Sequence, residues 1–190
     1  AHAFGLPDLY DLRYDGGVDD SAGVGRWDAM GWGAHGWNGD DGPNELSAWS
    51  LEQLGWIRAE DGTLVEVEAD GPIRVRDLTQ GGSIYRIALP PRSTGQGLTG
   101  EYLLLEYRSR QRDYGRGLPA EGLLVWRVAP QAMNNETEAN KQVDLVCADG
   151  VYADAGYPLG RAGDGRFGGD NLDFWAHDEA YSDRHGGNDG

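Results

Sequence analysis

Basic residues, cysteine and long apolar runs are all scarce in this sequence of 190 residues. Lys and Arg number 16 against 32 Asp and Glu, which gives a formal net charge of −16. Nucleic acids and anionic membrane surfaces bind basic faces, so this balance argues against both as partners. No apolar run approaches the roughly 18 residues of a membrane-spanning helix. The charge instead suits a secreted or salt-exposed protein, or one that binds cations.

The single cysteine excludes two further classes of protein. Cys147 has no partner within the chain, so the sequence is not a scaffold held by internal disulfides. A zinc site built from several cysteines is excluded for the same reason. Because Cys147 lies in the apolar run at residues 143–148, we expect a packed strand residue rather than a nucleophile.

Glycine and the large aromatics are plentiful. The sequence holds 31 Gly, 7 Trp and 9 Tyr, and this aromatic content excludes a disordered acidic tail. The length fits one medium domain or two small ones. The chain opens without Met or a signal peptide and closes on a glycine-rich segment. We therefore expect a fragment of a longer secreted protein.

The pattern changes near residue 58. Residues 1–58 are loop-rich and contain one good helix prediction at residues 43–56, with a capping box at Ser50 and Gln53 and a stop at Gly55. Beyond them, period-two alternation or short apolar runs predict strands at residues 63–68, 73–76, 83–89, 101–108, 122–128 and 143–147. No helical pattern separates these strands, which favours an antiparallel sandwich or barrel.

The first eleven residues carry the most chemical information. His2, Gly5 and Asp8 have the spacing of the second half of the zinc-peptidase motif His-Glu-x-x-His-x-x-Gly-x-x-Asp/His. In that motif two histidines on one helical face bind zinc, and the glutamate acts as general base. The glycine then breaks the helix so that a third ligand can return to the metal. The spacing alone also fits a surface histidine followed by a turn.

Several motifs in one order resemble the immune inhibitor A family of secreted bacterial zinc metallopeptidases. They are GLPDLYD at residues 5–11, GVGRWDAMGWG at 23–33, the segment at 43–56, EYLLLEYR at 101–108, GLP at 117–119, GLLVW at 122–126 and VDLVCADG at 143–150. The resemblance covers most of the chain up to about residue 170. It implies an α+β fold, with residues 1–58 as the C-terminal part of a metzincin-like catalytic domain. Residues 59–190 would form a mainly antiparallel, β-sandwich-like domain with a Gly/Asp-rich tail.

The resemblance also implies an activity and its residues. The parent protein would be a secreted zinc metalloendopeptidase acting on protein or peptide substrates. His2 and Asp8 match the second and third zinc ligands, and Met30 matches the methionine turn beneath the metal. The first histidine and the catalytic glutamate would precede Ala1, so we expect this chain alone to be inactive. His35 is a candidate substrate contact, and Arg127 stands where relatives often carry histidine.

Two clusters of Asp and Gly are candidate calcium sites, because calcium takes six to eight oxygen ligands from flexible loops. Their carboxylates are Asp15, Asp19, Asp164, Asp170 and Asp173. The other interpretation is a pair of solvated acidic loops. If calcium orders the chain, a rival function is an extracellular binding or adhesion module that presents Trp32, Trp37 and Trp175. A non-catalytic relative with the same fold is a further alternative.

Overall fold

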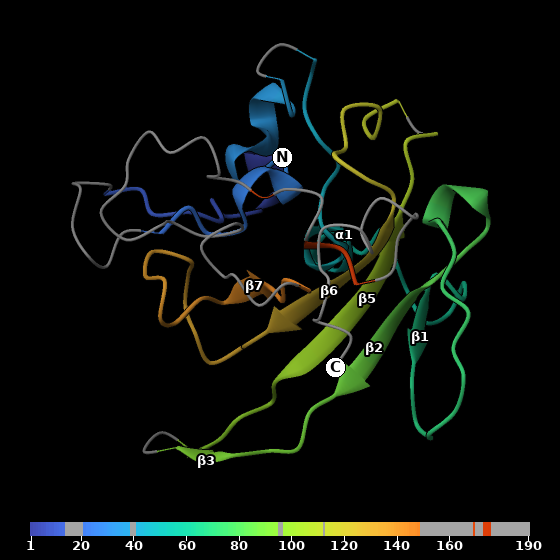
Figure 1. The fold of residues 1–190 in the computed structure, drawn as a ribbon. Coiled ribbons are helices and arrows are strands. Elements are labelled where there is room, and N and C mark those ends of the chain that lie inside the picture. Colours follow the sequence, from blue (N-terminus) through green and yellow to red (C-terminus); the bar gives the residue numbers. More distant parts are fainter. Residues whose placement is uncertain are drawn as a thin grey trace.

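A computed structural model describes residues 1–13, 21–38, 41–94, 97–111, 113–148, 169 and 173–175. Five strands form one open sheet in the order β1-β2-β5-β6-β7, and two more form a short ribbon (Figure 1). The sheet strands are β1 (Leu64–Glu66), β2 (Ile84–Ala88), β5 (Tyr102–Arg108), β6 (Gly122–Val128) and β7 (Val143–Leu145). The ribbon pairs β3 (Ser93–Thr94) with β4 (Gly97–Leu98).

The sheet is mixed. β1 runs parallel to β2, and the other neighbours in the sheet are antiparallel. The described residues therefore form a mixed α/β fold around one open sheet, and they contain no second sheet of the size that a sandwich needs. The predicted strand at residues 73–76 is wrong, because these residues form no ladder. The carbonyl of Arg74 instead accepts a hydrogen bond from the Tyr85 hydroxyl at 3.3 Å.

The predicted helix is present but shorter. Helix α1 spans Ala48–Gln53 and begins at Ser47, whose side chain accepts a hydrogen bond from the Ser50 backbone N–H at 3.2 Å. Ser50 is therefore not the cap, because its own hydroxyl donates to the Asp28 carboxylate at 2.7 Å. Gly55 follows the helix with φ of +65°, as expected for a C-terminal glycine. No helix in the described part of the chain is long and apolar enough to cross a membrane.

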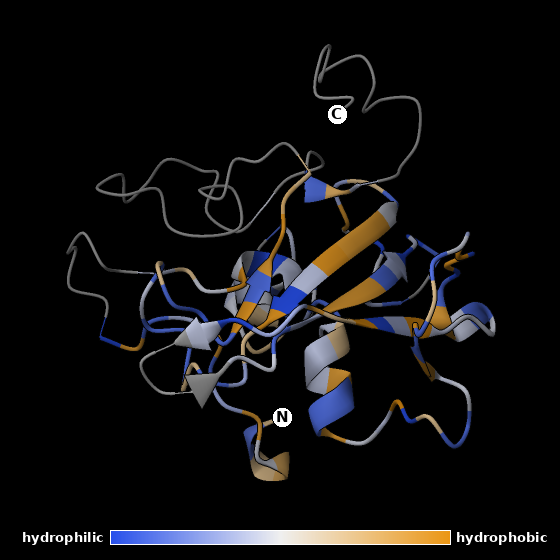
Figure 2. Ribbon diagram, turned by 90° about the horizontal axis from the view of Figure 1, so that it is seen from below, coloured by the Kyte–Doolittle hydropathy of each residue, from blue (hydrophilic) through white to orange (hydrophobic). Residues whose placement is uncertain are grey.

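One hydrophobic cluster runs from the N-terminal loops to the sheet. Helix α1 packs against β5 and β6, and alternate residues of both strands are buried. Figure 2 shows hydrophobic residues along these central strands, with α1 and the N-terminus beside the sheet. The Trp27 indole lies edge-on to the rings of Trp37 and Phe174, with centroids 4.7 and 5.1 Å away. Cys147 is buried as predicted, although it lies beyond β7, which ends at Leu145. The core therefore includes residues from both sides of residue 58.

Candidate metal site and a neighbouring cleft

The chain turns back on itself directly after its first helix. The short 3₁₀ helix η1 (His2–Phe4) ends at Gly5, which has φ of +90° and donates its N–H to the His2 carbonyl at 2.8 Å. A side chain at this φ would be strained, so the turn requires glycine. This is the turn that the motif expects, and it brings Asp8 back toward His2.

His2 and Asp8 meet at hydrogen-bond distance. The Nε2 atom of His2 lies 3.2 Å from Oδ1 of Asp8. The other ring nitrogen, Nδ1, lies 2.9 Å from the carbonyl of Leu6. A carbonyl can only accept, so Nδ1 carries the hydrogen, and in the neutral ring Nε2 then presents a lone pair to the carboxylate. Two acceptors at this distance require a proton or a metal ion between them.

The distance also fits two corners of a zinc site. Zinc binds histidine nitrogen and carboxylate oxygen at about 2.0–2.2 Å, so ligand atoms on a tetrahedral site stand about 3.4 Å apart. The observed 3.2 Å is close to that value. The bond from Nδ1 to a backbone carbonyl is also typical of metal-binding histidine, because it fixes the tautomer and the ring orientation. The two residues therefore fit zinc as a pair of ligands.

Met30 lies next to the segment that carries Asp8. Its side chain is buried, and its carbonyl accepts from the Leu9 N–H at 2.9 Å. The other side of Leu9 is held too, because its carbonyl accepts from the Val24 N–H at 3.0 Å. A Cβ at Gly23, whose φ is +64°, would stand 1.5 Å from the Leu9 carbonyl oxygen. Glycine is therefore needed there for the two segments to approach so closely.

A buried polar network fixes the Met30 segment to α1 and β5. The Asp28 carboxylate accepts from the backbone N–H groups of Met30 at 2.6 Å and Ser47 at 2.8 Å. Arg108, fully buried on β5, donates to the Trp27 carbonyl at 2.6 Å and to the Glu106 carboxylate at 3.0 and 3.2 Å. Burial alone would lower the pKa of Arg108, but Glu106 and the other nearby carboxylates outweigh it and raise that pKa.

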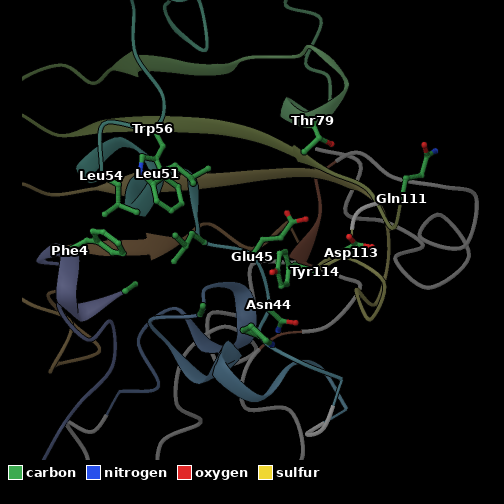
Figure 3. Close-up of a pocket in the computed structure, with 14 residues that line it drawn as sticks. Phe4, Asn44, Glu45, Leu51, Leu54, Trp56, Thr79, Gln111, Asp113 and Tyr114 are labelled. Atoms are coloured by element: carbon green, nitrogen blue, oxygen red, sulfur yellow. The ribbon is translucent and has the colours of Figure 1, made fainter.

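A cleft of about 850 Å³ adjoins η1 and α1. Figure 3 shows that one end of the cleft is apolar, where Phe4 faces the side chains of α1 and of the residues directly after it. The other end, near Asp113, is polar. Glu45 lies between the two ends. The apolar lining includes Phe4, Leu51, Leu54 and Trp56, and the polar lining includes Thr79, Gln111, Asp113 and Tyr114. His2 and Asp8 are not among the described lining residues, although Ala1 and Phe4 of the same N-terminal segment are.

The remaining predicted residues do not join the His2–Asp8 pair. His35 is exposed at the end of the 3₁₀ helix η3 (Trp32–His35). Trp37 is buried against Trp27, which removes it from the aromatics that a binding module would present, whereas Trp32 and Trp175 are exposed. Arg127 pairs with Glu101 at 2.8 Å on the sheet.

The candidate calcium residues are mostly outside the described residues, namely Asp15, Asp19, Asp164 and Asp170. Asp173 is described and fully buried, and its Oδ2 accepts from the Trp27 indole N–H at 2.9 Å. Within the described ranges, no group of three or more His, Cys, Asp or Glu side chains is placed to hold a metal ion. The His2–Asp8 pair supplies two such side chains.

Sequence reasoning missed Tyr10. Partial burial raises the pKa of its phenol, and the charge of nearby Asp8 raises it further. Comparison of the chain with family models, with curated proteins and with solved structures gives no match.

Proposed function

We propose that this chain is part of a secreted zinc metalloendopeptidase of the immune inhibitor A type, with a metzincin-like site at its N-terminal end. The observation that carries the proposal is the 3.2 Å approach of His2 Nε2 to Asp8 Oδ1, with Nδ1 held by a backbone carbonyl. The Gly5 turn and the buried Met30 segment beside Leu9 support it, because the motif needs both.

Each residue has a separate task in this proposal. His2 and Asp8 hold the metal, and the Leu6 carbonyl keeps the His2 ring in the tautomer that leaves Nε2 free to bind it. The Met30 carbonyl accepts a hydrogen bond from the N–H of Leu9 and so holds the residue that follows Asp8. Bound zinc supplies the Lewis acidity that makes water nucleophilic at neutral pH. The substrate is the peptide bond of a protein, and the general base is the glutamate that the motif places before Ala1.

The metal site can be tested in the chain of 190 residues. We expect Zn²⁺ to shift the imidazole NMR signals of His2, with affinity lowered in both His2→Ala and Asp8→Asn, because each variant removes one ligand. His35→Ala is the matched control and is expected to bind as the original chain does. Asp8→Asn also separates this site from simple chelation by the Ala1 amino group and His2. Equal zinc affinity in the original chain and Asp8→Asn would contradict the site.

The activity requires a second experiment. The 190-residue chain is expected to show no chelator-sensitive cleavage of casein, because two ligands bind zinc weakly and the motif's general base lies elsewhere. A version that includes the preceding residues is expected to cleave casein, provided that the coding sequence places His-Glu-x directly before Ala1. A different sequence at those three positions would exclude this peptidase mechanism.

A further inference from the structure

The loop that connects β6 with β7, residues 129–142, is held firmly at its return to the sheet. The fully buried Asn135 donates its side-chain N–H to the Val143 carbonyl at 2.6 Å, and its side-chain oxygen accepts from the Val143 N–H at 3.0 Å. The N–H of Gln142 donates to the Asn134 carbonyl at 2.9 Å. Lys141 directly precedes Gln142, so its backbone has little freedom to shift.

Three oxygen atoms surround the ammonium group of Lys141, whose side chain is only 2% exposed. Its Nζ lies 2.7 Å from Oε1 of Glu138, 2.6 Å from Oδ1 of Asp144 and 3.3 Å from the carbonyl oxygen of Gly23. An ammonium has three N–H donors, so each donor has one acceptor. Burial alone would lower the pKa of Lys141, but Asp144 and Glu138 outweigh it and raise that pKa. The side chain therefore stays charged inside the fold.

One of the three oxygens belongs to a segment far away in the sequence. Gly23 lies in the N-terminal segment at residues 21–24, and Glu138 reaches the same segment, because its Oε2 accepts from the Ser21 hydroxyl at 2.7 Å. The Ser21 oxygen also accepts from the Gly23 N–H at 3.0 Å. The loop between β6 and β7 therefore holds this segment through two side chains, Lys141 and Glu138.

Residues 21–24 in turn hold the backbone close to the candidate metal pair. The N–H of Val24 donates to the Leu9 carbonyl at 3.0 Å, and the Ser21 carbonyl accepts from the Asp11 N–H at 2.9 Å. A displacement of residues 21–24 would therefore reach residues 9–11 directly.

We propose that Lys141 is an internal cation that fastens the loop between β6 and β7 to residues 21–24. Two carboxylates and a backbone carbonyl are oxygen ligands of the kind that calcium takes in protein loops. Here the ammonium supplies the positive charge among them. The junction is thus ordered by a charge that belongs to the chain itself, and this inference does not depend on the zinc site proposed above.

The test compares Lys141→Met with Arg13→Met in the full 190-residue chain by urea unfolding. Methionine keeps most of the side-chain volume and removes the ammonium. Lys141→Met is expected to raise the equilibrium constant of unfolding by about 100-fold or more, because two carboxylates lose their buried cation. Arg13→Met is the matched control, because the exposed ion pair of Arg13 with Glu136 joins the same loop to the N-terminal part of the chain. Its loss is expected to raise the constant by no more than about five-fold.

Two further measurements separate this role from ordinary packing. The amide nitrogen of Val24 shares its peptide group with the Gly23 carbonyl, so its NMR signal is expected to shift in Lys141→Met and to stay in place in Arg13→Met. Lys141→Met also leaves the Asp144 carboxylate without its cation. Adding Asp144→Asn to Lys141→Met is therefore expected to lower the equilibrium constant of unfolding again by about 10-fold or more.

Each outcome decides for or against the internal cation. Equal effects of Lys141→Met and Arg13→Met would overturn the proposal, as would an unshifted Val24 signal. If Lys141→Met does not fold, a folded double variant supports the proposal. A double variant that is no more stable than Lys141→Met, or that also fails to fold, refutes it. The zinc affinity of the original chain is measured separately, so the failure of either proposal leaves the other intact.

Discussion

Replacing Arg108 by methionine is the sharpest test of how the fold supports the candidate site. Arg108 is fully buried on β5 and donates to Glu106 and to the carbonyls of Trp27 and Leu46. Methionine fills much of the space but donates nothing. Glu106 would keep its bonds from the Trp126 indole at 2.8 Å and the Ala48 N–H at 3.3 Å, yet it would lose its charge partner.

The expected cost is large. Removing one member of a buried ion pair typically costs about 3–5 kcal/mol, because the remaining charge stays buried. Arg116→Met is the matched control, because Arg116 forms an exposed pair with Asp113 and is expected to matter by no more than about 0.5 kcal/mol. Urea unfolding followed by tryptophan fluorescence gives both values. If Arg108→Met costs no more than Arg116→Met, the reasoning is refuted.

A milder variant keeps the test usable if Arg108→Met does not fold. Glu106→Gln preserves shape and leaves Arg108 its two backbone carbonyl partners, Trp27 and Leu46. It is expected to cost about 1–3 kcal/mol, because it removes the charged acceptor and leaves part of the guanidinium unmatched. If Glu106→Gln leaves the free energy of unfolding unchanged, and the dependence of that free energy on urea concentration is also unchanged, the Arg108–Glu106 pair does not stabilise the fold as argued.

Two further predictions concern the sheet and the Leu9 segment. Burial acts to raise the pKa of Glu101, but hydrogen bonding and charge from Arg127 outweigh it and lower that pKa below its ordinary 4.5. Ionised Glu101 therefore stabilises the fold above about pH 4.5, and this contribution is lost as the pH falls through the lower pKa of the folded state. Between about pH 6 and pH 3.5, the free energy of unfolding should fall less in Glu101→Gln than in the original chain. Gly23→Ala is expected to cost about 2 kcal/mol or more in urea unfolding, because its Cβ would strike the Leu9 carbonyl at positive φ. Gly71→Ala, where the Cβ meets open space, is the control and is expected to change stability by less than about 0.5 kcal/mol.

Long apolar segments were predictable, whereas short alternating ones were predictable only in part: those at residues 63–68 and 83–89 contain β1 and β2, but the one at 73–76 forms no strand. The strands at residues 101–108 and 122–128 appear as β5 and β6 because each can bury a continuous face. The segment at 73–76 shows the same alternation as β1, but alternation forms a strand only where a partner strand is free to pair with it. The parallel pairing of β1 with β2 left no signal, because no helical pattern marks the connection between them.

Polar contacts between distant segments were the least predictable part. The sequence predicted Ser50 as the cap of α1, but the Ser50 hydroxyl donates to Asp28, some twenty residues earlier, and Ser47 caps the helix instead. The strand at 101–108 looked almost wholly apolar, yet Glu106 and Arg108 lie on its buried face. The available signal was the spacing, because two residues two apart in a strand lie on the same face. Two opposite charges can be buried on that face only if they pair with each other.

These distant contacts bear on how the candidate pair, exposed His2 and half-buried Asp8, is held in place. The His2 side chain is 62% exposed, so its own burial contributes little to its position. Other residues supply the support. Arg108 on β5 donates a hydrogen bond to the Trp27 carbonyl, and the carboxylate of the adjacent Asp28 accepts one from the Met30 N–H. Met30 in turn holds Leu9, the residue that follows Asp8. The buried charged groups Arg108 and Asp28 therefore hold the backbone beside Asp8, and residues 1–11 alone carry no sign of this support.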